Sequence, residues 1–472
     1  MFETVAIPVW AFFLIGLFAA LSVLDRIIGP SMRWFFRKRA ERVVAELNKR
    51  LERPIEPFKL ARRHDMIQRL RHDPEVARAV IDYAKAEGIP EEVASTQAER
   101  YAREIVPSFS ATAYFGFGTR AARWISDALF HVQVGDEGDR ALADIAADAT
   151  VIFVINHRSN VDYLLVTWLA AKRSALSYAV GEWARVWPLS SLIRTMGAYF
   201  IRRRSLNPLY RKVLARYVQL ATEGGVAQAI FPEGGLSLDG KIAPLKLGLL
   251  SYIVAGHTPD GRNVVFVPVA LNYDRVIEDR ILTTANAEGT RRFRASFPTA
   301  ARFTIRQLLH RLRGRLYRFG QAAVSYGTPL SLAEIAARHP EDTTEALARD
   351  IRCELEKIMP VLAVPLIALV IEGIQAPMTR ADLKAQVSDL AEAMRSRGAR
   401  VSLTSDNLAS AVDSGIDALV LRRLLVEAPE GLTIGPKAPP ILAYYANSIR
   451  HLAPLEFDTK AIPIEAETEV DS

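Results

Sequence analysis

The chain has 472 residues, half of them hydrophobic, with a formal net charge of +7. This composition is typical of a globular protein of two or more domains and excludes a wholly disordered chain. The single cysteine, Cys353, excludes an intramolecular disulfide and a cysteine-based zinc site. The modest basic excess argues against a nucleic-acid partner.

An apolar run near the beginning of the chain, residues 5–24, carries no charged side chain. As a helix it would rise about 30 Å, which is one hydrocarbon thickness. Basic residues follow it, mixed with aromatic ones: Arg26, Arg33, Trp34, Phe35, Phe36, Arg37, Lys38, Arg39 and Arg42. Because positive charge marks the cytoplasmic side, we expect residues 1–40 to hold the protein at the cytoplasmic face of a membrane, the inner or plasma membrane if it is bacterial.

Two forms of this membrane-anchor helix stay open. One spans the bilayer, and the other is re-entrant or lies on the surface, since Pro8, Gly16 and Gly29-Pro30 could break a helix. A cleaved signal peptide is disfavoured, because Glu3 precedes the run and the arginines come after it.

Residues 41–130 read as a helical region. Asp73-Pro74 has good helix-start chemistry, Gly88 is a suitable end, and Pro90 opens the next helix. Residues 131–330 change character, because short apolar runs alternate with helical patterns. This alternation predicts an α/β domain with a helix-covered, mixed and largely parallel sheet. The expected strands are 150–155, 177–180, 198–201, 227–231, 264–271 and 322–326, and the expected helices are 161–171, 209–222 and 246–255.

Residues 331–455 return to helical patterns at 343–359 and 380–397. The apolar run 358–371 contains two prolines and is too short to span a membrane, so we expect a buried or interfacial segment. Residues 456–472 form an acidic tail.

The first polar segment of the α/β region is residues 156–163 (NHRSNVDY), directly after an expected strand. Ser159 could cap a helix beginning at Asn160, with Asp162 in its first turn. Five residues in a continuous helix are about 500° apart, so His157 and Asp162 can meet only if His157 lies in the loop before the helix. Asp162 could then bind one ring nitrogen and leave the other as a general base. The residues alone support both interpretations.

Three later segments also follow or contain expected strands. In residues 197–204 (GAYFIRRR), the arginines suit a phosphate group, a solvated loop or anionic lipid. In residues 231–237 (FPEGGLS), the paired glycines allow a ligand to approach the backbone, and Glu233 could contact substrate hydroxyls or the arginines; an ordinary turn is the alternative. Residues 267–275 (VPVALNYDR) indicate little more than a buried strand with a proline near its start.

Together and in this order, the four segments resemble the glycerol-3-phosphate acyltransferase family of phospholipid synthesis. Its His-x4-Asp box, often H-R-S-x-x-D-Y, matches residues 157–163. The tail of its G-x-F-I-R-R motif is matched by residues 199–203, its F-x-E-G-G motif matches 231–235, and its strand proline is Pro268. Residues 444–451 (YYANSIRH) look like a segment near the end of the glycerol-phosphate branch, so the resemblance covers roughly 100–455.

The resemblance implies that His157, oriented by Asp162, deprotonates the sn-1 hydroxyl of glycerol 3-phosphate, which attacks an acyl thioester directly to give lysophosphatidate. It implies phosphate contacts from arginines and lysines and an acceptor pocket shaped by the other motif residues. The binding residues expected on this basis are Arg158, Ser159, Arg202, Arg203, Glu233, Gly234, Gly235, Lys241, Lys246 and Pro268. Neither a metal nor a cofactor is expected. The co-substrate is acyl-CoA or acyl carrier protein, and the basic surface suits both because both are acidic.

One departure concerns the acceptor. Many family members carry an arginine after the third motif, where this chain has Leu236. Dihydroxyacetone phosphate and 1-acylglycerol 3-phosphate therefore stay open as acceptors. A non-catalytic, lipid-binding membrane scaffold and a thioesterase are the alternatives of another class. The sequence sets no oligomeric state.

Overall fold

The computed structural model describes residues 41–135, 142–170, 174–181, 189–202, 207–289, 319–374 and 376–454, together with Trp10 and Lys38. The chain divides into a unit of residues 1–55 and a compact unit of residues 56–472. In the first unit, residues 41–48 are helical. The expected anchor, residues 1–40, and the acidic tail, 456–472, lie outside the described residues except at Trp10 and Lys38. Among the described residues, no helix is long and apolar enough to cross a membrane.

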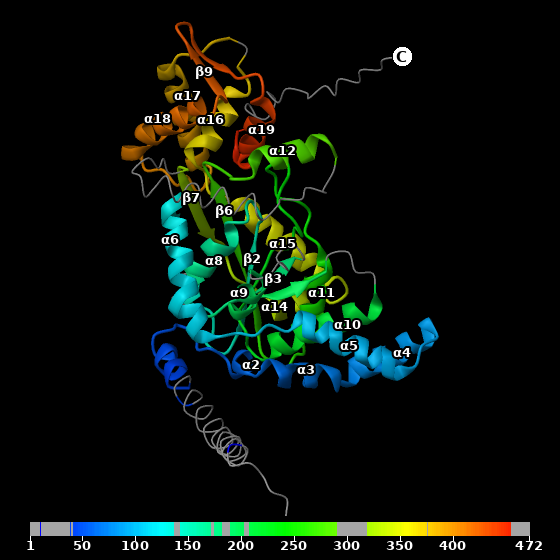
Figure 1. The fold of residues 1–472 in the computed structure, drawn as a ribbon. Helices are drawn as coiled ribbons and strands as arrows, with labels where there is room; N and C mark the ends of the chain where they lie inside the picture. The colour runs from blue at the N-terminus through cyan, green and yellow to red at the C-terminus, as the bar shows by residue number, and fades with distance from the viewer. Residues whose placement is uncertain are drawn as a thin grey trace, which may run out of the picture. The chain divides into compact units, whose positions relative to one another are not determined.

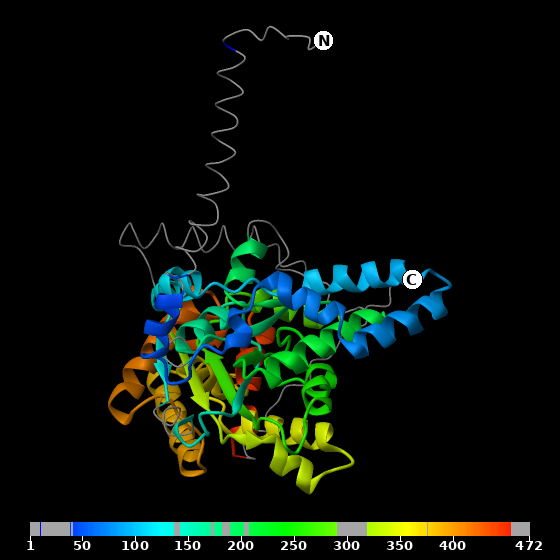
Figure 2. The same cartoon turned by 90° about the horizontal axis from the view of Figure 1, so that it is seen from below.

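The second unit begins with helices, as the sequence predicts. Asp73 accepts hydrogen bonds from the first backbone N–H groups of one helix, and Gly88 ends that helix with a positive φ of 64°. The elements are α2 (Pro57–Leu60), α3 (Arg63–Arg71), α4 (Pro74–Glu87), α5 (Glu91–Ile105), a π-helical segment (Thr112–Gly118) and α6 (Thr119–Leu129). Helices α4 and α5 lie side by side at the lower end of the second unit in Figure 1, which Figure 2 views from below.

A mixed, largely parallel sheet follows. In the described part of the chain its strand order is β1-β7-β6-β2-β5-β3-β4, with the short β8 added beside β6. Only the pairs β6–β7 and β6–β8 are antiparallel. The strands are β1 (His131–Val134), β2 (Thr150–Ile155), β3 (Ser177–Gly181), β4 (Tyr199–Ile201), β5 (Gln228–Ile230), β6 (Val264–Tyr273), β7 (Gln321–Tyr326) and β8 (Leu330–Ser331). The six expected strands are confirmed to within about two residues, whereas β1 and β8 were missed.

Helices cover both faces of this sheet (Figure 1). Alternate residues of a strand point to opposite faces. Val269 of β6 faces α8, whereas its neighbour Pro268 faces Ile358 at the end of α15. The helices among the strands are α8 (Asp162–Ala170), α9 (Leu189–Thr195), α10 (Pro208–Glu223), α11 (Leu247–Ala255) and α12 (Asp279–Ala287).

The expected helix start at Asn160 is wrong. Residues 160 and 161 form a turn, and α8 begins at Asp162. The backbone N–H groups before it are held by the Asp162 carboxylate itself, which favours a loop over another helical turn. Helices α9 and α12 are short, seven and nine residues, and were not expected.

The C-terminal region is mainly helical: its first two helices, α14 and α15, pack against β6 of the sheet, and the later elements lie beyond the carboxyl end of β6, near α12 (Figure 1). It contains α14 (Leu332–Arg338), α15 (Thr343–Lys357), α16 (Ala363–Ile371), α17 (Arg380–Ser396), α18 (Ser405–Leu421), the hairpin β9 (Leu425–Ala428) and β10 (Gly431–Ile434), α19 (Pro439–Asn447) and a 3-10 turn (Arg450–Leu452). Every residue of α16 is buried, with α17, α18 and α19 packed around it. The apolar run 358–371 is therefore a buried segment whose residues 363–371 form a core helix, the first of the two expected forms.

Candidate active site

The site forms where parallel strands β2, β4, β5 and β6 end on one edge of the sheet. Directly after β2, the Asn156 side chain donates to the Leu271 carbonyl and accepts from the Leu271 N–H, at 3.0 and 2.7 Å. These two hydrogen bonds extend the hydrogen-bond ladder between β2 and β6 by one residue. The next residue, His157, leaves the sheet in a fixed position.

Asp162 joins the loop to the start of α8. Its Oδ2 atom lies 2.9 Å from His157 Nδ1 and accepts from the N–H groups of Arg158 and Ser159 at 2.7 and 3.0 Å. His157 thus lies in the loop before the helix, as the spacing required. The carboxylate favours the tautomer with a proton on Nδ1, which leaves the Nε2 lone pair available as a base.

The His157 ring is almost closed off from solvent, with 2% of the residue exposed. Its centroid lies 4.5 Å from the Phe231 ring and 5.4 Å from the Tyr163 ring. The backbone is held on both sides, since the His157 N–H donates to Glu233 and its carbonyl accepts from the Ser237 N–H. Access of a substrate to Nε2 therefore requires side chains near the ring to move.

Glu233 holds two loops together. Its Oε1 accepts from the His157 N–H at 2.8 Å, and its Oε2 accepts from the Ala243 N–H at 3.0 Å. Burial raises the pKa of this carboxyl, and the two backbone donors oppose that rise. Glu233 contacts none of the arginines by hydrogen bond in the described part of the chain, so its contacts are those of a loop anchor.

The glycine pair after Glu233 forms a tight turn. Gly234 has a φ of +70°, and a Cβ added there would lie 2.7 Å from Lys246 Cδ and 2.8 Å from Lys246 Nζ. Gly234 is thus needed both for its backbone conformation and for the close approach of the lysine. Gly235 is half-buried beside it, and Lys241 and Lys246 are exposed.

Arg158 and Ser159 point into the protein. The Arg158 side chain is 1% exposed, and its guanidinium donates to the Gly240 carbonyl. The Ser159 hydroxyl donates to Glu278 at 2.7 Å. Both predicted binding residues therefore make contacts that fix the loop.

Of the two arginines expected to bind phosphate, the structure describes Arg202. Its guanidinium makes a two-pronged ion pair with Glu104 of α5, at 2.8 and 2.7 Å, and lies 5.3 Å from the ring centroids of both Tyr101 and Tyr210. Arg203 lies outside the described residues. Pro268 is buried within β6, opposite Val154, and is part of the sheet.

Two important residues escaped the sequence prediction. The hydroxyl of Tyr273, the last residue of β6, donates to Asp162 Oδ1. Glu278, before α12, accepts from the Ser159 hydroxyl and from Asn160, and burial raises its pKa. The available signal was the group of polar residues 272–275 at the end of the buried strand, which does not include Glu278.

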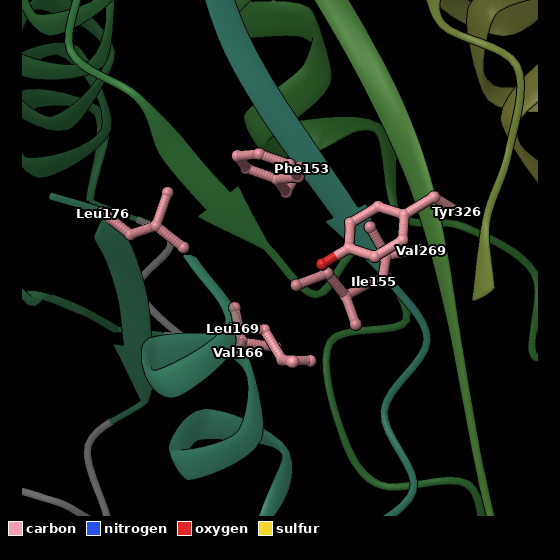
Figure 3. A pocket seen from close by; sticks show the side chains of 7 residues that line it. All are labelled: Phe153, Ile155, Val166, Leu169, Leu176, Val269 and Tyr326. Atoms are coloured by element: carbon pink, nitrogen blue, oxygen red, sulfur yellow. The ribbon is translucent and has the colours of Figure 1, made fainter. Parts of the chain in front are cut away.

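A small apolar pocket lies on the α8 face of the sheet, beside the site. Figure 3 shows side chains from β2, α8, β6 and β7 converging there with Leu176. Its lining is Phe153, Ile155, Val166, Leu169, Leu176, Val269 and Tyr326. Ile155 precedes His157 by two residues and Val166 is one turn beyond Asp162, so the pocket is adjacent to the histidine loop. Among the described residues, no cluster of three or more His, Cys, Asp or Glu side chains could hold a metal ion.

Two protein-family models match successive parts of this chain. The family model described as Acyltransferase matches residues 138–272, which include the histidine loop and the glycine turn. The model of the glycerol-3-phosphate acyltransferase C-terminal region matches residues 304–456. The chain is therefore similar to an acyltransferase domain over residues 138–272 and to the C-terminal region of glycerol-3-phosphate acyltransferases over residues 304–456.

Curated relatives are similar over more than half of this chain. A glycerol-3-phosphate acyltransferase of Pseudomonas fluorescens (strain Pf0-1) is 32% identical over 281 residues, which are 58% of this chain and 32% of the relative. One of Pseudomonas paraeruginosa is 28% identical over 332 residues, which are 66% and 38%. This chain thus spans about a third of the length of these relatives.

A solved structure, the 1-acyl-sn-glycerophosphate acyltransferase of Thermotoga maritima, aligns with 56% of this chain and 82% of its own, at 17% identity and a TM-score of 0.32. A score this low adds nothing to the fold assignment.

Proposed function

We propose that this chain transfers an acyl group from an acyl thioester to the sn-1 hydroxyl of glycerol 3-phosphate, giving lysophosphatidate. The observation that carries the proposal is the buried contact of 2.9 Å between His157 Nδ1 and Asp162 Oδ2. A purely lipid-binding scaffold has no need of a base held in this way. The named relatives support glycerol phosphate as the acceptor.

In the proposed reaction, His157 Nε2 takes the proton of the acceptor hydroxyl as its oxygen attacks the thioester carbonyl. The new C–O bond forms, the C–S bond breaks, and the imidazolium returns the proton to the departing thiolate. Asp162 stabilises the imidazolium between these steps, so no acyl-enzyme and no cofactor are required. The buried ring also favours a bound acceptor over bulk water, against a thioesterase.

The apolar gap beside the histidine loop (Figure 3) measures only about 10 Å³, which is room for no more than one water molecule, so an acyl chain would have to bind elsewhere or widen it. The donor carrier is acyl-CoA or acyl carrier protein.

For the acceptor phosphate, Lys246 is the cation that the structure brings against the glycine turn. Arg202 already faces Glu104, so its expected effect on acceptor binding is smaller than the motif alone suggests. We propose Lys246, with Lys241, as the main phosphate contact in place of the missing arginine at Leu236. Lys246→Met should raise KM for glycerol 3-phosphate about tenfold with little change in kcat. Lys212→Met, which removes a half-exposed partner of Glu75, is the control.

We also propose that the protein works at the cytoplasmic face of a membrane. The support is the uncharged run 5–24 followed by basic residues. Lipid bilayer, acyl donor and glycerol phosphate are then its partners.

The acceptor is tested with purified protein, labelled acyl-CoA or acyl carrier protein, and a panel of glycerol 3-phosphate, dihydroxyacetone phosphate and 1-acylglycerol 3-phosphate. We expect the largest kcat/KM with glycerol 3-phosphate. Equal or faster turnover of another acceptor would overturn the assignment. Release of free fatty acid that is independent of acceptor would indicate a thioesterase instead.

A further inference from the structure

The hydroxyl of Tyr273 contacts the carboxylate that faces His157. Tyr273 is the last residue of β6, is fully buried, and donates to Asp162 Oδ1 at 2.5 Å. Its ring packs against Phe130, with centroids 5.2 Å apart, which limits its rotation. The position of the hydroxyl is therefore set by the sheet and by this ring contact.

The two oxygens of Asp162 have separate partners. Oδ2 accepts from His157 and from two backbone N–H groups, whereas the bond that the structure gives to Oδ1 comes from Tyr273. Burial, and next the Asp162 charge, raise the pKa of Tyr273 well above its usual range, so the hydroxyl keeps its proton and remains a donor.

A hydrogen bond to Oδ1 has a defined effect on the other end of the pair. It draws negative charge away from Oδ2 and makes the carboxylate a weaker acceptor. Loss of the Tyr273 hydroxyl should therefore leave Oδ2 a stronger acceptor that holds a protonated imidazole more tightly. The same bond fixes the plane of the carboxylate and hence the direction of the imidazole.

We propose that Tyr273 is a positioning residue that acts through Asp162, forming a His157–Asp162–Tyr273 chain that sets both the orientation and the working pH range of the base. This inference rests on the proposed function, in which His157 is the general base. Tyr273 itself touches neither the imidazole nor a reacting atom in this assignment.

The loop has enough other contacts to survive loss of this hydroxyl. Asn156 ties it to Leu271, Glu233 binds the His157 N–H, and Glu278 binds Ser159 and Asn160. Tyr273→Phe keeps the ring against Phe130 and removes one oxygen. The variant should therefore fold, so that its kinetics report on the hydrogen bond.

The first test is the pH dependence of kcat/KM for acyl transfer. In Tyr273→Phe, the acid limb should move about half a unit to one unit higher, because the more basic carboxylate favours imidazolium. The plateau of kcat should fall about tenfold, with KM for the acceptor changed less than about twofold. Tyr217→Phe, another buried tyrosine, on α10, should keep the wild-type profile. An acid limb that stays at its wild-type position in Tyr273→Phe would overturn the proposal.

A double-mutant cycle separates action through Asp162 from a local packing effect. If Tyr273 acts through the carboxylate, adding Tyr273→Phe to Asp162→Asn should change kcat less than about twofold. A full tenfold loss in the Asp162→Asn background would contradict the proposal.

A measurement without substrate makes the test independent of the acceptor. The ring signal of His157, assigned by its loss in His157→Gln, can be titrated by NMR in the whole protein. Its midpoint should rise in Tyr273→Phe even if glycerol 3-phosphate proved to be the wrong acceptor. An unchanged midpoint would reject the His157–Asp162–Tyr273 chain and leave the proposed function to the acceptor panel.

Discussion

At the residue scale, Asp162 does two jobs with one carboxylate. It accepts a hydrogen bond from His157 Nδ1–H. It also accepts hydrogen bonds from the N–H groups of Arg158 and Ser159, and these shape the loop. An amide at this position could accept through one atom only, and its NH2 group would oppose the remaining donors. The residue thus couples the geometry of the loop to the tautomer of the base.

Asp162→Asn should lower kcat by about 10²-fold or more, because the base would lose its orientation and its counter-charge. Steady-state kinetics on the folded variant measure this. Asp148→Asn, at an exposed position before β2, is the matched control and should keep wild-type kcat. A fully active Asp162→Asn enzyme would contradict the assigned role.

Asp274 is a buried carboxyl that the proposed chemistry does not use. It accepts from the N–H groups of Gln321 and Val364, and burial raises its pKa to about 6 from 3.8. Since the folded state binds the proton more tightly than the unfolded state, the free energy of unfolding should fall as pH rises between those values. Above about pH 6 the loss in free energy of unfolding is complete and amounts to about 3 kcal/mol.

The corresponding measurement is urea unfolding of wild type and Asp274→Asn between about pH 4 and pH 7. The wild type should lose stability relative to the variant across this range, because the amide does not titrate. A constant difference between the two, or one that grows in favour of the wild type, would contradict the assignment.

At the element scale, the turn after β5 depends on a glycine backbone. Gly234→Ala should lower the free energy of unfolding by about 1–2 kcal/mol, because an L-residue is strained at φ +70°. Gly248 lies in α11, and a Cβ added there meets no atom within 4 Å. Gly248→Ala should therefore raise the free energy of unfolding by up to about 1 kcal/mol. Denaturant midpoints of the two variants would show opposite shifts; shifts of the same sign would reject this view of the turn.

Local patterns predicted the strands and the loop position of His157, because strand β2 is a continuous buried run and the five-residue spacing admits one arrangement. They could not predict what the motif side chains contact. Glu104 is 98 residues from Arg202, and Glu278 is 119 residues from Ser159. Nothing in the local sequence distinguishes an arginine that pairs with such a distant acid from one that faces a ligand.

At the scale of the whole second unit, the C-terminal region completes the support of the site. Asn447 of α19 donates to the Asp239 carbonyl at 2.9 Å, and the Tyr445 hydroxyl accepts from the Val276 N–H at 3.0 Å. A Cβ on Gly240 would lie 1.8 Å from the Tyr444 carbonyl oxygen. The loops after β5 and β6 are thus both held by α19; the sequence marked residues 444–451 by resemblance alone and did not predict this support.

Asn447→Ala should reduce kcat/KM about threefold to tenfold, since it removes a single hydrogen bond to the loop that binds Arg158 and Ser237. Asn407→Ala, exposed on α18, should leave the kinetics unchanged. Equal kinetics for the two variants would show that α19 does not support the loops after β5 and β6.

The most direct test of the account is acyl transfer by His157→Ala, measured beside His72→Ala, which removes an exposed histidine after α3. Circular dichroism and unfolding midpoints would establish that both variants are folded. The account predicts a loss of about 10²- to 10⁴-fold in kcat for His157→Ala and wild-type kcat for His72→Ala. Transfer to glycerol 3-phosphate at the wild-type rate by folded His157→Ala would contradict it.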